Sequence, residues 1–243
     1  MAIRTGWGRL DDMNFQPPSR APSARVSPLG EDAILLNFTS PQADCVPDTV
    51  QHKLWHLIAW LEPQREALGL LEIVPGMGNL LLRGAQLSAL HSLGEAIIRQ
   101  WPDLAEQGVA GRCIDIPVSY GAEHGPDLEA IAIYCGLSPE QVIARHCSAT
   151  YTVLCLGFQP GFAYLGGMDK ALHMPRRASP RLSVPAGSVA IGGSHSAIYP
   201  SQSPGGWHII GQTQRQLFAA DAAQPVLLRP GDSVRFLRHP EST

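Results

Sequence analysis

The sequence predicts an α+β protein in two parts, a small region of strands and helices followed by a closed β-barrel of short strands. In the first part, apolar residues recur with the 3.6-residue period of amphipathic helices at 50–61 and 87–101. Beyond residue 149, short apolar segments alternate with glycine and proline turn signals, and closing such strands into a barrel removes exposed sheet edges. We therefore expect an α+β domain over residues 27–106 and a barrel domain over residues 112–240.

The N-terminal domain should contain strands at 33–38, 70–74 and 79–82 beside its two helices. The last two strands are joined by Pro75-Gly76-Met77-Gly78, for which a tight hairpin turn is the first interpretation and a phosphate cradle the alternative. The cradle is disfavoured because no lysine followed by serine or threonine comes after it.

The second domain should begin with a strand near Ile114. Two short helices are expected next, one over 127–134 closed by Gly136, and one whose start at Ser138-Pro139-Glu140-Gln141 has the pattern of a capping box. The remaining expected elements are all strands, at 151–158, 187–191, 207–211, 226–228 and 233–237.

Composition narrows the function classes. The net charge is −3, and no dense Lys/Arg cluster occurs outside residues 174–181, which argues against nucleic-acid binding. The five cysteines are an odd number without a C-x-x-C pair, so neither a disulfide framework nor a metal site is expected, and a reducing cytoplasm is the predicted location. Residues 1–26 carry arginines, prolines and serines without an apolar run, and predict a flexible extension.

Three clusters that mix glycine, proline, aromatic and polar residues lie at 157–165, 184–189 and 204–207. Residues 157–211 hold ten of the chain's 24 glycines, and glycine costs folding entropy unless a positive φ or a close approach requires it. These glycines could simply turn the corners of the barrel. We interpret them instead as rigid loops that present a binding site.

The side chains near these clusters predict a site for a small anionic amide. The guanidinium groups of Arg176 and Arg177 suit carboxylate, bicarbonate or phosphate oxygens, and the alternative for them is ion pairing between subunits. Gln159 and Tyr164 could orient an amide. The predicted substrate-binding residues are Gln159, Tyr164, Arg176, Arg177, Gly192, Gly193, Tyr199, Trp207 and Thr213.

Within this set, the backbone N–H groups of Gly192 and Gly193 are expected to contact an anion. Tyr199, Trp207 and Thr213 are expected to close the pocket, and packing around barrel corners is the alternative for Tyr199 and Trp207. The neighbours Ser194, His195 and Ser196 do not define a catalytic pair, because such pairs assemble in space, so no nucleophile or general base is assigned.

On these motifs the chain resembles the allophanate hydrolase subunit 1 family over about residues 28–238. The fold implied by the resemblance is a small, ferredoxin-like α+β domain followed by a cyclophilin-like closed β-barrel. The segments that carry the resemblance are Pro75-Gly76-Met77, Tyr120-Gly121, Gly125 to Leu128, Gly157 to Tyr164, Pro175-Arg176-Arg177, Val184 to Val189, Ile191-Gly192-Gly193, Tyr199-Pro200, Pro204 to Trp207 and Leu228 to Val234.

The activity implied by the resemblance is ATP-dependent opening of the lactam 5-oxoproline to glutamate by a multi-subunit enzyme. The partners would be subunits A and C of 5-oxoprolinase, with C the other cyclophilin-like subunit. No cofactor is expected on this chain alone, and the assembled enzyme would consume ATP. Two alternatives are a regulator that inhibits a histidine kinase and a carboxyltransferase subunit acting on urea-like amides, which would need a biotin-carrying partner.

Overall fold

The computed structural model describes residues 24–39, 46–105 and 111–239. The chain forms two compact units, residues 1–109 and 110–243, each described below by itself. The first strand already begins at Arg25, two residues before the predicted domain start. Residues 1–23 of the predicted extension lie outside the described residues.

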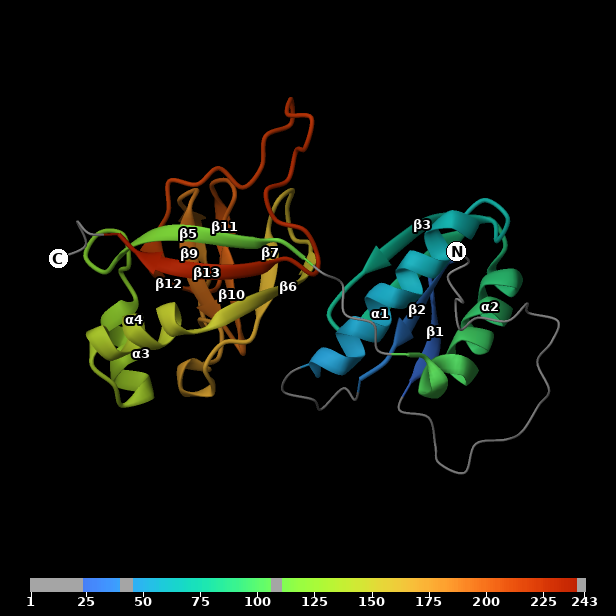
Figure 1. Cartoon of the computed structure of the whole chain (residues 1–243), viewed down its shortest axis with the longest axis horizontal. Coiled ribbons are helices and arrows are strands. Elements are labelled where there is room, and N and C mark those ends of the chain that lie inside the picture. The colour runs from blue at the N-terminus through green and yellow to red at the C-terminus, as the bar shows by residue number, and fades with distance from the viewer. Residues whose placement is uncertain (1–23, 40–45, 106–110, 240–243) are drawn as a thin grey trace. The chain divides into compact units, whose positions relative to one another are not determined.

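The described N-terminal unit is a four-stranded antiparallel sheet in the order β1-β2-β4-β3 with two helices on one face (Figure 1). Fully buried Leu36, Leu57 and Leu82 join the sheet to the helices in one apolar core. The elements are β1 (Arg25–Leu29), β2 (Ala33–Asn37), α1 (Asp48–Leu61), β3 (Leu70–Pro75), β4 (Asn79–Gly84) and α2 (Leu87–Gln100), with 3₁₀ turns at Glu62–Gln64 and Trp101–Asp103.

The α+β class of this unit is confirmed, but its connection differs from the ferredoxin-like one. A ferredoxin-like fold runs βαββαβ, whereas the described elements here run ββαββα. The difference arises because β1 pairs with β2 as an antiparallel hairpin before the first helix, with Arg25 opposite Asn37. The strand β1 was not predicted from the sequence.

The connection between β3 and β4 is a hairpin, as its first interpretation held. The Gly76 N–H donates to the Asn79 carbonyl at 2.9 Å, and the Gly78 N–H donates to Gln51 Oε1 at 3.1 Å. Gly78 has φ +65, which glycine adopts without strain. Because these two amides are bonded within the protein, the phosphate-cradle alternative loses its donors.

The described residues of the second unit form a closed barrel of seven strands in the order β10-β7-β6-β13-β5-β12-β9. Neighbouring strands are antiparallel except β13 and β5, which run parallel. The strands are β5 (Cys113–Tyr120), β6 (Thr150–Leu156), β7 (Ala163–Gly166), β9 (Ser188–Gly192), β10 (His195–Ile198), β12 (His208–Gln212) and β13 (Ser233–Arg238), and a separate two-stranded sheet contains β8 (Arg181–Val184) and β11 (Ser203–Gly205).

The two predicted helices of this unit are present, as α3 (Leu128–Cys135) and α4 (Pro139–Ser148), and lie together against one end of the barrel (Figure 1). Gly136 ends α3 in the left-handed conformation with φ +66. Ser138 and Gln141 form the reciprocal capping box at the start of α4. The predicted strand at 226–228 is wrong, because that segment makes only an isolated bridge between Phe218 and Val226.

Two apolar clusters share the wall made by β9, β10 and β12. Val189, Ile191 and Ile210 belong to the cluster that all seven barrel strands feed, and therefore point into the barrel. Ala190 and Ile209, their chain neighbours, belong to another cluster. Since side chains alternate along a strand, this second cluster lies on the outer face of the barrel wall.

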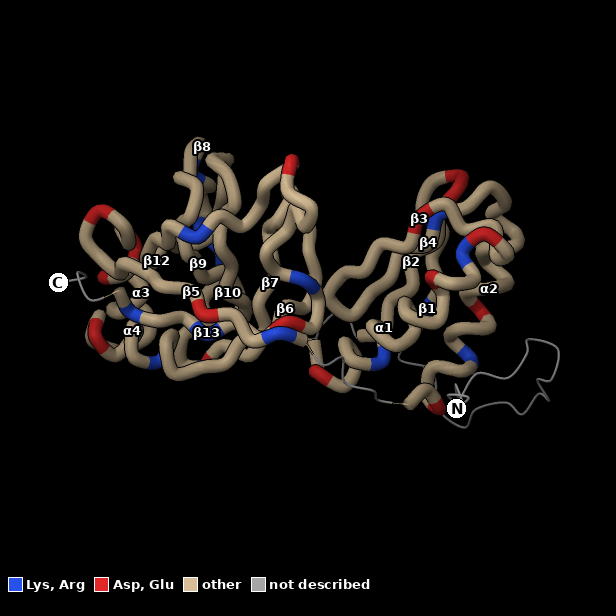
Figure 2. The backbone as a smooth tube through the Cα atoms, turned by 45° about the horizontal axis from the view of Figure 1, so that its top comes forward, with Lys and Arg blue, Asp and Glu red and all other residues tan. Residues whose placement is uncertain are grey.

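Figure 2 shows Lys/Arg and Asp/Glu positions scattered over the described trace. No helix of the described residues is both long enough and apolar enough to cross a membrane. The predicted cytoplasmic location stays a prediction.

Candidate functional site

The outer cluster of the barrel is built on aromatic rings. Phe162, Tyr199 and Trp207 are each at most 5% exposed. The Phe162 ring lies edge-on to its neighbours, with centroids 5.4 Å from Tyr199, 5.8 Å from Trp207 and 5.1 Å from Tyr164. Edge-to-face packing at these separations is favourable beyond the apolar area that it buries, so the rings hold one another in a fixed arrangement.

Two glycines let these rings lie directly against the backbone of neighbouring strands. A Cβ at Gly192 of β9 would overlap the indole of Trp207, and a Cβ at Gly205 of β11 would overlap the Tyr199 ring. Neither glycine has a positive φ. Close approach of a ring, and not backbone conformation, is therefore what these positions require.

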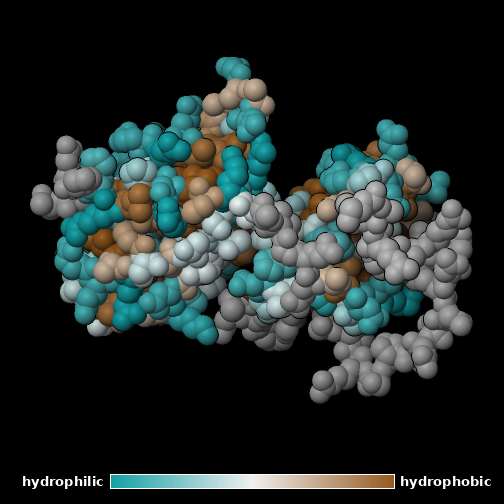
Figure 3. Space-filling view, viewed as in Figure 1, coloured by the Kyte–Doolittle hydropathy of each residue, from teal (hydrophilic) through white to brown (hydrophobic). Residues whose placement is uncertain are grey.

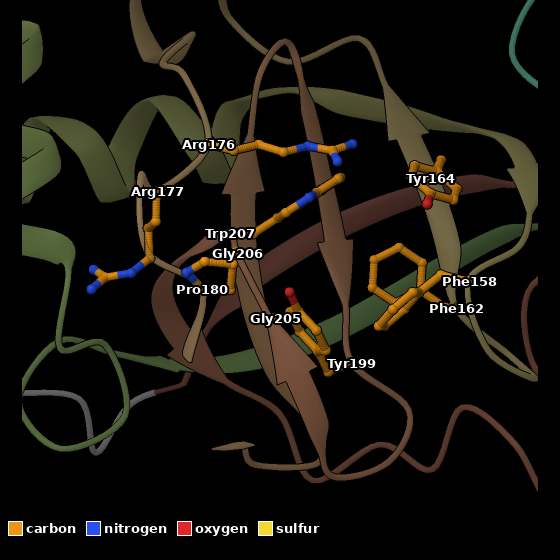
Figure 4. Close-up of a pocket in the computed structure, with 10 residues that line it drawn as sticks. All are labelled: Phe158, Phe162, Tyr164, Arg176, Arg177, Pro180, Tyr199, Gly205, Gly206 and Trp207. Atoms are coloured by element: carbon orange, nitrogen blue, oxygen red, sulfur yellow. The ribbon is translucent and has the colours of Figure 1, made fainter. Parts of the chain in front are cut away.

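A pocket of about 220 Å³ opens beside these rings (Figure 4). Figure 3 shows apolar surface in the barrel unit framed by hydrophilic residues. The pocket is smaller than most drug-binding cavities, and this size suits a small molecule. Its lining residues are Phe158, Phe162, Tyr164, Arg176, Arg177, Pro180, Tyr199, Gly205, Gly206 and Trp207.

Arg176 is the exposed cation of the pocket. Its guanidinium carbon lies 5.6 Å from the centroid of the Trp207 ring, a cation–π contact. Among the described residues it forms no ion pair with a carboxylate. The guanidinium fork is therefore available to an anion.

A buried carboxylate holds the other two arginines of the segment. Asp127 is 4% exposed and accepts hydrogen bonds from Arg177 Nη1 at 2.9 Å, from Arg181 Nη1 and Nη2 at 2.8 Å each, and from the Ile209 N–H at 2.7 Å. Burial alone would raise the pKa of Asp127, but the hydrogen bonds from Arg181 and Ile209 and the charge of Arg177 lower it. Asp127 therefore stays ionised.

This arrangement leaves the pocket positively charged. Arg176, Arg177 and Arg181 are three guanidinium groups, and Asp127 supplies one carboxylate among them. In addition, the Nε–H of Arg177 is buried without a hydrogen-bond partner among the described residues. Such a donor needs an oxygen from water or from a ligand.

The two tyrosines of the pocket are neutral phenols. Burial raises the pKa of Tyr164 and that of Tyr199. Each phenol can therefore donate a hydrogen bond at neutral pH, and Tyr164, which is only partly buried, reaches the pocket.

The structure brings most of the predicted site residues to this pocket. Tyr164, Arg176, Arg177, Tyr199 and Trp207 all line it. Gln159 does not line the pocket, although its chain neighbour Phe158 does. The Gln159 side chain exchanges hydrogen bonds with Ser201, including one of 2.9 Å from Ser201 Oγ to Gln159 Oε1. Gly192 lies beneath Trp207.

Two of the predictions need correction. The Gly193 N–H donates to the Met174 carbonyl at 2.8 Å, so the Gly193 amide is already bonded and does not serve as an anion donor. Thr213 is not among the lining residues. Its N–H donates to the Gly187 carbonyl at 2.9 Å and its Oγ1 accepts from the Arg215 N–H at 3.2 Å, which fixes it in a turn.

Three side chains at or beside the pocket were not among the predicted site residues. Phe158 and Phe162 lie in the first glycine-rich cluster but were not named as site residues. Asp127 belongs to the Gly125 to Leu128 motif, where it was considered only as the start of a helix. Its carboxylate makes no cap bond to α3, because it is directed to the arginines and Ile209.

Ser196 does pair with a histidine, but inside the barrel and away from the pocket. His146 Nε2 lies 3.0 Å from Ser196 Oγ, and His146 Nδ1 lies 2.8 Å from the Tyr120 hydroxyl. Both His146 and Ser196 are 0% exposed. Burial lowers the pKa of His146 to about 3, so this pair is a neutral core network.

The described residues of the second unit thus combine a closed barrel with an arginine- and aromatic-lined pocket of small-molecule size on its outer wall. The model of the carboxyltransferase domain, subdomain C and D, matches residues 24–228. The chain therefore belongs to this carboxyltransferase domain family.

Two named proteins are similar to this chain over most of its length. The B subunit of 5-oxoprolinase from Escherichia coli O157:H7 is 44% identical over 90% of this chain and 97% of its own length. The B subunit of 5-oxoprolinase from Bacillus subtilis (strain 168) is 37% identical over 88% of this chain and 92% of its own length. The crystal structure of TTHA0988 superimposes with a TM-score of 0.68 at 36% identity, covering 85% of this chain, and the chain spans 39% of that longer protein.

Proposed function

We propose that this chain is the B-type subunit of an ATP-dependent 5-oxoprolinase, which converts 5-oxo-L-proline, ATP and water to L-glutamate, ADP and phosphate. The similarity to proteins of that name extends over nearly their whole length. The structural observation that carries the proposal is the Arg176 guanidinium over Trp207, at the mouth of a pocket of about 220 Å³. A small ring with one carboxylate matches this pocket in size and charge.

Each polar group of the pocket has a role in this proposal. Arg176 binds the substrate carboxylate through its fork. Tyr164 donates a hydrogen bond to the lactam oxygen through its phenol, whose pKa burial raises further above neutral pH. The unpartnered Nε–H of Arg177 binds a lactam or phosphate oxygen.

The chemistry requires more than this chain. A lactam is a poor electrophile, so transfer of a phosphoryl group from ATP to the lactam oxygen creates a good leaving group. Water then adds at that carbon, and the C–N bond breaks with its electron pair going to nitrogen, which takes a proton. This leaves an acyl phosphate, which a second water hydrolyses to the free carboxylate and phosphate. We assign the ATP contacts and the general base to the partners, subunits A and C, with C adjacent to the barrel.

Reconstitution with the two partners tests the proposal. Release of ADP and glutamate that depends on 5-oxoproline should require all three subunits, and activity without this chain would contradict it. Arg176→Ala should raise the KM for 5-oxoproline about ten- to hundredfold, the value expected for a lost charge-assisted hydrogen bond. The matched control is Arg235→Ala, an exposed arginine paired with Asp115 outside the pocket.

A second candidate is a carboxyltransferase component acting on urea-like amides, favoured by the family to which the chain belongs. The same pocket could orient a carboxylated amide through Arg176. Urea-dependent turnover with a biotin-carrying partner, and none with 5-oxoproline, would establish this candidate in place of the first.

A further inference from the structure

The loop between β6 and β7 crosses the edge of the pocket in an unusual conformation. Phe158 has φ +67, and the Gln159 N–H donates to the Gly157 carbonyl at 2.8 Å across it. A hydrogen bond to the second residue before the donor around a positive φ defines a classic γ-turn, which is rare and strained. The turn is locked because the Gly157 N–H donates to the Phe162 carbonyl at 3.1 Å and the Phe162 N–H returns to the Gln159 carbonyl at 3.0 Å.

Burial does not compensate for the strain at Phe158. Glycine would take this φ freely, whereas phenylalanine rarely adopts it. The Phe158 ring is 60% exposed and touches its neighbours only edge-on, with centroids 5.2 Å from Phe162 and 6.3 Å from Tyr199. A large apolar side chain that is both strained and mostly exposed calls for a reason outside folding.

The position of the ring supplies that reason. Phe158 lines the pocket, and Figure 4 shows its ring across the pocket from Arg177 and Pro180, with Trp207 between them. The pocket therefore has an apolar end formed by Phe158 and Phe162 and a cationic end. Ala122, the other described non-glycine residue with positive φ (+46), lies in the turn after β5 and does not line this pocket.

We propose that Phe158 is a specificity-determining residue of the pocket, and that the strained turn holds its ring ready to cover the apolar face of a small cyclic carboxylate. The carboxylate of that ligand binds Arg176 and its ring methylenes pack on Phe158. This inference rests on the proposed function for the identity of the substrate, 5-oxo-L-proline. On this inference, Phe158 at the rim of the pocket selects for the shape of the ligand ring, while the arginines select for its charge.

Three variants in the assembled complex test the inference. Phe158→Gly and Phe158→Ala should both raise the KM for 5-oxo-L-proline about tenfold, because the apolar contact is lost in each. Phe158→Tyr, which retains the ring, should keep the wild-type KM. Phe158→Gly should unfold at a higher urea concentration than Phe158→Ala, since only glycine relieves the turn. The matched control Ala122→Gly relieves strain elsewhere and should leave KM unchanged.

The outcomes separate this inference from the function beneath it. An unchanged KM in Phe158→Gly, with the complex intact, overturns the inference. Dissociation of the complex, with an unchanged KM in the part that stays assembled, also overturns it, because Phe158 would then be a partner contact. A wild-type complex inactive on 5-oxoproline refutes the proposed function. Calorimetric titration of the chain with 5-oxo-L-proline, L-proline and benzoate then tests the inference by itself. Binding by wild type that Phe158→Gly loses supports the inference, whereas equal binding by both proteins, or no binding by either, overturns it.

Discussion

The two faces of the wall formed by β9, β10 and β12 are built from opposite choices of residue. The inner face carries large side chains, Val189, Ile191, Ile198 and Ile210, which fill the barrel. The outer face alternates with them and carries the small residues Ala190, Gly192 and Ala197 beside one large residue, Ile209. The small outer residues leave room for rings that arrive from loops, so the inner face provides stability and the outer face provides a site.

The largest effect should come from breaking the barrel core into which the inner face packs. Phe236 is fully buried and packs against His146 and Tyr151, with centroids 4.4 and 5.1 Å away. Phe236→Ala should lower the free energy of unfolding by about 3–5 kcal/mol, because it removes a buried ring and leaves a cavity. Urea denaturation measures this, and the KM of the protein that remains folded should match wild type. A changed KM would show that the two faces are not separable.

Removing the charge that orders the arginines should have a smaller effect on stability and a larger one on the site. Asp127→Asn keeps an acceptor for the Ile209 N–H but loses the charged partner of Arg177 and Arg181, at a cost of about 1.5–3 kcal/mol. We expect a raised KM with a stable complex. Asp127→Glu should recover part of the KM, and a loss of stability without any change in KM would reduce Asp127 to a structural role.

The outer face can be tested at a single atom. Gly192→Ala adds a Cβ that would overlap Trp207, and we expect a cost of about 1–3 kcal/mol from this overpacking. The Trp207 ring should move away from Arg176, so the KM should rise as well. A crystal structure of the variant with Trp207 in place and an unchanged KM would contradict this account of the glycine.

Lowering the pH should reduce the free energy of unfolding through the buried His146. For one histidine the slope is about 1.4 kcal/mol per pH unit. His146 has a pKa of about 3 when folded against 6.5 in an unfolded chain, so only the unfolded state binds the proton between these values. Stability should therefore fall as pH falls below 6.5 and should be unaffected by this group above it.

Comparison with His146→Gln isolates the contribution of His146. Burial also lowers the pKa of His195, to about 4, so wild type and variant share that second slope. The difference between their free energies of unfolding should shrink from pH 6.5 toward pH 4. A constant difference would mean that His146 is protonated in the folded protein.

Much of the fold follows from local patterns in the sequence. The period of apolar residues predicted α1 and α2, and Ser138 with Gln141 predicted the start of α4. The missed strands were short, since β7, β8, β10 and β11 hold only three or four residues each and β1 holds five. Segments of that length have too few alternations to show a period of two, and only pairing in three dimensions makes them strands.

The site was predictable in composition and not in connectivity. Tyr164, Arg176, Tyr199 and Trp207, which were predicted because rings, cations and glycines cluster in the sequence, line one pocket. The bonds of Asp127 to arginines 50 and 54 residues away have no local signal. The prediction for Gly193 failed for the same reason, because its amide is consumed by Met174 from a distant loop.

The buried network around His146 has one direction. Ser196 Oγ donates to the Ala190 carbonyl at 3.2 Å, so it must accept from His146 Nε2–H, and Nδ1 must then accept from the Tyr120 hydroxyl. Tyr120 in turn accepts from the Cys147 thiol at 3.5 Å. The Cys147 thiol donates a hydrogen bond at one end of this network, and the Ala190 carbonyl accepts one at the other end. The hydroxyl groups and the imidazole between them are therefore each fixed in one orientation. The carbonyl belongs to β9, the strand whose Gly192 lies beneath Trp207. The network therefore ties α4 to this strand from the inner side of the barrel, although no residue of α4 lines the pocket.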